Sequence, residues 1–105
     1  MTSIKITRTD NILCFSCAGH AEFAQKGRDI VCAGISALCA ALLGRIRELA
    51  SEKQTEIKKC RIADGCFVLD FTLTEKAEEC YKSVLCGFEF IAKAYPENCK
   101  VFVGE

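Results

Sequence analysis

The spacing of apolar residues divides this chain into two units of the same kind, each with two alternating segments followed by a helical one. Residues 3–18 hold two alternating runs around Asp10-Asn11, a pattern that predicts a hairpin. From residue 30 to about 51, apolar residues recur on one helical face. The second unit has runs at 56–62 and 66–73 around an Asp-Gly turn, then a helix that Thr74 caps and Pro96 ends.

The final run, residues 99–104, predicts one more strand and completes the order ββαββαβ. Two helices on a five-stranded, mostly antiparallel sheet satisfy this order, so we expect an α+β fold. With 105 residues, half of them apolar, residues 1–105 should form a single domain whose core needs no metal or disulfide. The first half of helix 30–51 is apolar nearly all round, so we expect it to be covered on more than one side.

Charge gives no indication of a polyanionic partner. The chain has 14 basic and 14 acidic residues spread along its length and a net charge of zero, so we expect neither nucleic acid nor a membrane surface as a partner. The N-terminal segment alternates polar with apolar residues, unlike a signal peptide, and nowhere are about 18 apolar residues uninterrupted. We therefore expect a cytoplasmic protein.

Nine cysteines could suggest a disulfide framework, but that reading needs secretion and usually an even count. Cys14 and Cys17 have the spacing of a redox or zinc motif, yet a strand places residues three apart on opposite faces. We therefore expect no metal site and no cofactor. Six more cysteines lie among apolar neighbours and are predicted to fill the core as small hydrophobic residues: Cys39, Cys60, Cys66, Cys80, Cys86 and Cys99.

The segment between the first hairpin and the first helix, residues 19–29, is long and polar for a connection in so small a domain. Such loops are usually functional or disordered, although a plain surface loop is the alternative. Gly19 and Gly27 are predicted hinges, which would let the loop open for a bulky ligand and close over it.

Two reactive side chains bracket this loop. Asp29 is a predicted N-cap, which places Cys32 in the first helical turn, where the helix dipole stabilises an anion by at most about 2 kcal/mol. The negative charge of Asp29 would oppose ionisation of the Cys32 thiol, so a positively charged group is needed in addition to the helix dipole. His20, the only histidine, could supply it when protonated and then pass its proton to a leaving amine. Amides of the helix turn and the loop are candidate donors to an oxyanion.

Two nearby polar residues have open roles. Asp29 either orients the imidazole or only caps the helix, and the cap is favoured. Ser36 is either a polar neighbour of the site or a hydroxyl bonded back to its own helix, and the second is favoured. Taken singly, Cys32 would more often be a buried helix cysteine and His20 a loop histidine. The residues alone leave an enzyme and a non-enzymatic protein about equally favoured.

The segment GHAEFAQKGRDIVCAGISAL resembles the ribosomal-processing cysteine protease family, Prp, whose hallmark is Gly-His-Ala followed by Gly-x-Asp-Ile-Val-Cys-Ala and then Ser. One position departs from the pattern, because Gly34 stands where we would expect a bulkier residue, such as alanine. The matching positions are Gly19, His20, Ala21, Gly27, Asp29, Ile30, Val31, Cys32, Ala33 and Ser36.

The resemblance implies an endopeptidase in which Cys32 is the nucleophile and His20 the general base and acid. It also implies a substrate, the N-terminal extension of the twenty-seventh protein of the bacterial large ribosomal subunit, with aromatic residues just before the scissile bond and a small one after it. The resemblance also implies that the protein forms a homodimer, which would suit the large apolar surface of the first helix. Two rivals remain: a non-enzymatic ribosome-associated or regulatory binding module, and a redox-sensing thiol protein.

Overall fold

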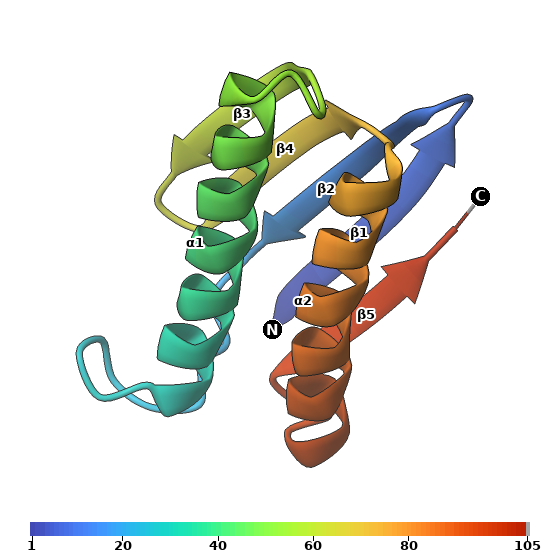
Figure 1. The fold of residues 1–105 in the computed structure, drawn as a ribbon. Helices are drawn as coiled ribbons and strands as arrows, with labels where there is room; N and C mark the ends of the chain where they lie inside the picture. The colour runs from blue at the N-terminus through green and yellow to red at the C-terminus, as the bar shows by residue number, and fades with distance from the viewer. Residues whose placement is uncertain (105) are drawn as a thin grey trace.

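The computed structural model describes residues 1–104 and confirms the α+β fold with the order ββαββαβ. Both helices pack on one face of a five-stranded sheet (Figure 1). The strand order is β3-β4-β2-β1-β5, with β1 and β5 parallel and the other pairs antiparallel. The elements are β1 (Thr2–Thr9), β2 (Ile12–Ala18), α1 (Ile30–Ser51), β3 (Ile57–Ala63), β4 (Cys66–Thr72), α2 (Glu75–Ala94) and β5 (Cys99–Val103).

The core lies between the sheet and the two helices. Phe67, Leu69 and Phe71 of β4 share one face, as their alternation predicts, and all three are buried. On β2, the ring of Phe15 lies 5.7 Å from that of Phe67 and 5.5 Å from that of Phe88 on α2. These aromatic contacts join the middle of the sheet to the second helix.

The two helices approach each other closely at two glycines. A Cβ atom built on Gly34 would lie 3.3 Å from the Cδ1 atom of Ile91, and one built on Gly87 would lie 2.8 Å from the Cδ2 atom of Leu38. Both distances are shorter than ordinary carbon–carbon contacts of about 3.5–4.0 Å. An alanine at residue 34 would therefore require the end of the Ile91 side chain on α2 to shift by a few tenths of an ångström.

The outer face of α1 is exposed, so the expectation that its first half is covered on more than one side is wrong for the chain taken alone. Apart from Ile30, which is 61% exposed, the exposed residues from there to Gly44 are small: Ala33, Ser36, Ala37, Ala40, Ala41 and Gly44. By length and composition alone, α1 is apolar enough to cross a membrane. Its inner face, however, is buried in the core through Ile35, Leu42, Ile46 and Leu49.

The cysteines are all free thiols, and their burial divides them. Cys14 and Cys17 lie on opposite faces of β2, as expected, because Cys17 is buried with the core and Cys14 is on the other face. Cys39 and Cys99 are buried, and Cys66 and Cys80 are partly buried. Cys60 and Cys86 are exposed, so the prediction that they fill the core is wrong. Cys60 is exposed because β3 is an edge strand.

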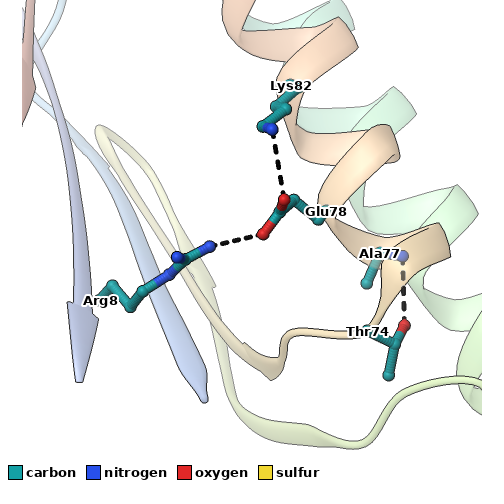
Figure 2. A network of polar contacts seen from close by, with 5 residues as sticks. All are labelled: Arg8, Thr74, Ala77, Glu78 and Lys82. Carbon is teal, nitrogen blue, oxygen red and sulfur yellow. Dashed lines mark hydrogen bonds and ion pairs between the residues drawn. The ribbon is translucent and has the colours of Figure 1, made fainter. Parts of the chain in front are cut away.

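Polar contacts fix the start of α2 against the end of β1 (Figure 2). The Thr74 hydroxyl accepts a hydrogen bond from the Ala77 amide at 3.3 Å, which confirms Thr74 as the N-cap. The Glu78 carboxylate lies 3.2 Å from the Lys82 ammonium and 2.6 Å from the Arg8 guanidinium. These cations, Lys82 first, lower the pKa of the Glu78 carboxyl. The network is exposed and therefore contributes little stability.

Candidate active site

His20 lies in the loop that follows β2, and neighbouring segments hold its backbone. The amide of Gly19 donates to the carbonyl oxygen of Gly65 at 2.9 Å, and the Met1 nitrogen donates to the carbonyl oxygen of His20 at 2.6 Å. Asn98 donates through its side chain to the carbonyl oxygen of Ala21 at 2.9 Å. Ala21 is fully buried, so this part of the loop belongs to the body of the fold.

The two glycines predicted as hinges have different surroundings. Gly19 has a φ of 94°, and a Cβ atom there would overlap the carbonyl oxygen of Met1. Only glycine combines this backbone angle with so close an approach. Gly27 also has a positive φ, 90°, but a Cβ atom there would meet nothing within 4 Å. Of the two positions, Gly27 has the space for movement, and the hinge role stays a prediction.

Asp29 joins the start of α1 to the His20 loop. One carboxylate oxygen accepts the Cys32 amide at 2.9 Å, which makes Asp29 the N-cap of α1. The other accepts the amides of Phe23 at 2.9 Å and Ala24 at 3.3 Å. These bonds, that from Cys32 first, lower the pKa of the Asp29 carboxyl because they favour its charged form. Asp29 is therefore a cap and a loop anchor, and within residues 1–104 it makes no hydrogen bond to the imidazole of His20.

The bonds to Asp29 limit which amides could act as oxyanion donors. The amides of Cys32, Phe23 and Ala24 already donate to the Asp29 carboxylate, and the Ala33 amide donates to the Asp29 carbonyl oxygen at 3.0 Å. An oxyanion hole built from these helix-turn and loop amides would first require them to leave Asp29. These four amides are therefore occupied, and the expectation that amides of the helix turn and the loop donate to the oxyanion stays a prediction.

Two adjoining cavities bring the two reactive side chains together. One, of about 340 Å³, lies between α1 and the β3–β4 hairpin, and the other, of about 630 Å³, lies under the loop of residues 19–29. Four residues line both: His20, Cys32, Ser36 and Asp64. Cys32 is partly buried, and His20 is exposed. A thiol and an imidazole on shared walls can act on one bound molecule.

Ser36 lies one turn after Cys32 and is exposed at both cavities. The hydroxyls of Ser51 and Ser83 donate to carbonyl oxygens of their own helices. Within residues 1–104, Ser36 forms no such bond, so the favoured interpretation of its role is wrong. Ser36 is a polar neighbour of the cavities.

The β3–β4 turn is the part of the site that the sequence did not predict. Asp64 lines both cavities, and Gly65 lies beside the imidazole of His20. The Asp-Gly pair was informative only as a turn signal, because nothing in the local sequence says which strand β4 pairs with. The pairing of β4 with β2, which ends at Ala18 and Cys66, brings this turn to the histidine.

The other titratable groups near the site offer no metal centre. Among residues 1–104, no three His, Cys, Asp or Glu side chains are grouped so that they could hold a metal ion. A hydrogen bond with Cys17, followed by burial, raises the pKa of the Cys39 thiol, and burial raises the pKa of the Cys80 and Cys99 thiols, so all three remain protonated near neutral pH. Burial, followed by the charge of Asp70, also raises the pKa of Cys14.

Comparison with known proteins shows the family to which this chain is similar. A family model described as cysteine protease Prp matches residues 1–100. The ribosomal processing cysteine protease Prp of Bacillus subtilis (strain 168) is 29% identical over 107 residues, which cover 94% of this chain and 92% of that protein.

Solved structures show the same fold. The essential ribosomal processing protease Prp from S. aureus, in complex with a covalently linked product peptide, superposes with a TM-score of 0.80 at 25% identity, covering 98% of this chain and 99% of that one. A protein from Streptococcus mutans superposes with a TM-score of 0.74 at 24% identity, covering 100% of this chain and 96% of its own. Because the family model spans nearly the whole chain, this protein belongs to the Prp family of cysteine proteases.

Proposed function

We propose that this protease removes the N-terminal extension of a large-subunit ribosomal protein, the twenty-seventh, with Cys32 as nucleophile and His20 as general base and acid. The observation that carries the proposal is that the only histidine and the helix-start cysteine line the same two cavities. The relatives from B. subtilis and S. aureus are named as ribosomal processing proteases, which supports the choice of substrate.

In this mechanism, the protonated imidazole of His20 and the positive end of α1 stabilise the Cys32 thiolate. The thiolate attacks the scissile carbonyl carbon, and the imidazolium gives its proton to the leaving amine, so that an acyl-enzyme forms. Water, activated by the now neutral imidazole, then releases the extension and restores the thiol. Within residues 1–104, no hydrogen bond joins the two side chains, and such bonds often tighten only when substrate is bound.

The smaller cavity suits an apolar side chain of the substrate. It extends from His20 and Cys32 to the apolar residues Ile35, Leu43, Ile62, and Phe67. Its volume of about 340 Å³ is at the lower end of the range for ligand pockets, roughly 300–1,000 Å³. Because Cys32 also lines this cavity, an aromatic side chain placed there would lie near the Cys32 sulfur. This placement supports cleavage after aromatic residues.

A synthetic peptide with two aromatic residues before a small residue, designed to mimic the ribosomal extension, tests the function. We expect the protein to cut it after the second aromatic residue and to cut the matched peptide with alanines in place of the aromatics far more slowly, because alanine leaves the apolar cavity unfilled. Mass spectrometry of the products measures both. If neither peptide nor the full ribosomal protein is cut, the proposed function is wrong.

The exposed face of α1 supports a homodimer, because its small residues let a second helix approach closely. We propose that two copies pair through this face at Ala37 and Ala41, beside the cavities that Ala33 and Ala40 line. Sedimentation equilibrium should then give twice the chain mass of 11.6 kDa, and Ala37→Glu should return the mass to that of one chain. A monomer at all concentrations would contradict the proposal.

The ribosomal substrate also leads us to propose a cytoplasmic location.

A further inference from the structure

The turn between β3 and β4 lies directly against the imidazole of His20. A Cβ atom built on Gly65 would lie 2.9 Å from the Nε2 atom of His20, 3.4 Å from its Cε1 atom and 3.5 Å from its Cδ2 atom. All three atoms belong to the ring, so the missing side chain of Gly65 is the space that the imidazole edge occupies. The φ of Gly65 is 69°, an angle that favours glycine for a second reason.

Gly65 also holds the backbone that leads into His20. Its carbonyl oxygen accepts the Gly19 amide at 2.9 Å. This bond continues the β2–β4 ladder, whose last pair is Ala18 with Cys66, by one residue on each strand. One residue therefore fixes the main chain before the histidine and borders the ring itself. The turn cannot shift alone, because β4 lies between β2 and β3 in the sheet.

We propose that Gly65 is a positioning residue for His20, which keeps the imidazole on the wall that it shares with Cys32. The inference rests on the proposed role of His20 as general base and acid. A Cβ atom at residue 65 would push Nε2 out of its place, because real Cβ contacts at 2.9 Å do not occur and the turn behind it is held by the sheet. A misplacement of about 1 Å in a catalytic group can cost about 10²-fold in rate.

Two substitutions separate contact with the ring from strain in the turn. Gly65→Ala adds a Cβ atom at a positive φ that alanine tolerates poorly, whereas Gly65→Asn adds the same atom and tolerates this φ. We expect both variants to lower kcat for the aromatic peptide by about 10–100-fold with little change in KM, because the ring moves and the apolar cavity stays. Strain alone would affect Gly65→Ala and spare Gly65→Asn, which would overturn the proposal.

The position of the ring can be measured without any cleavage. His20 is the only histidine, so its imidazole gives one set of proton and nitrogen resonances. In the unsubstituted protein, we expect nuclear Overhauser contacts between the imidazole protons and the Gly65 α-protons. Their absence overturns the proposal even if both variants fail to fold. In folded variants, we expect the imidazole resonances to shift, and unchanged resonances would also overturn it.

A double-mutant cycle shows whether Gly65 acts through His20. The rate at which iodoacetamide alkylates Cys32 is measured in the unsubstituted protein, in Gly65→Asn, in His20→Ala and in the double variant. If the effect of Gly65 passes through the imidazole, Gly65→Asn slows alkylation in the presence of His20 and has no further effect in its absence. An equal loss in both backgrounds would overturn the proposal. If the peptide is not cut by the unsubstituted protein but these contacts and rates behave as expected, the proposed function fails and the placement of the ring stands.

Discussion

Replacing Cys32 by alanine is expected to abolish cleavage of the aromatic peptide, with a loss of at least about 10³-fold in kcat, because the sulfur that forms the acyl-enzyme is removed. The fold should survive. Cys32 is partly buried in the first turn of α1, its amide keeps the bond to Asp29, and alanine is a better helix former than cysteine. Product analysis by mass spectrometry and thermal unfolding of both proteins measure the two expectations.

Cys86→Ala is the matched control for this substitution. Cys86 is also on a helix, but it is exposed on α2 and lines neither of the two cavities. We expect this variant to cleave the peptide at the rate of the unsubstituted protein. Undiminished cleavage by Cys32→Ala would contradict the role of Cys32 as nucleophile.

Limited alkylation distinguishes an activated thiol from an ordinary one. At a pH below 7, an unperturbed thiol with a pKa of about 8.5 is almost entirely protonated and reacts slowly. Cys60 and Cys86 are exposed and serve as internal references. The hydrogen bond with Cys17, followed by burial, raises the pKa of Cys39, and burial raises that of Cys80 and Cys99, which slows the reaction of all three. We expect iodoacetamide to label Cys32 first. Labelling of Cys60 or Cys86 at the same rate would favour a non-enzymatic binding module.

Local patterns in the sequence were enough to predict every helix and strand. Helix α1 begins at Ile30 and ends at Ser51, as its apolar spacing and its cap indicate, and α2 begins after Thr74. These signals are short-range, since a cap acts within one turn and alternation within one strand. The sequence also indicated Cys32 and His20 as a candidate pair, because a cysteine in a first helical turn and the only histidine flank one long loop, and their catalytic roles stay predictions.

Contacts between distant segments could not be predicted in the same way. The strand order places β3 at an edge, which exposes Cys60, although its neighbours in the sequence are partly apolar. The same order brings Gly65 to the histidine, 45 residues away in the chain. Asp29 was predicted as a cap, but its second set of bonds, to Phe23 and Ala24, depends on how the loop folds back. The close approach of Ile91 to Gly34, the position that departs from the family pattern, also depends on where α2 lies.

His20→Ala is the second substitution for which we expect a large effect. General acid–base catalysis contributes about 10²–10⁴-fold to rate, so cleavage should fall by that factor. The fold should persist, because His20 is exposed and the bonds at its carbonyl oxygen and at Ala21 involve only the main chain of this loop. Thermal unfolding checks this point, and kcat/KM for the aromatic peptide measures the loss.

The pH dependence of alkylation then shows what the imidazole does to the sulfur. If protonated His20 stabilises the thiolate, its removal slows the labelling of Cys32 below pH 7, whereas near pH 9 the two proteins should react alike, because an ordinary thiol is already largely ionised there. Imidazole added to the buffer should restore part of the cleavage, since the site of the missing ring opens to two solvent-accessible cavities. Identical alkylation profiles across this pH range would show that His20 does not activate Cys32, and the loop histidine would then need another role.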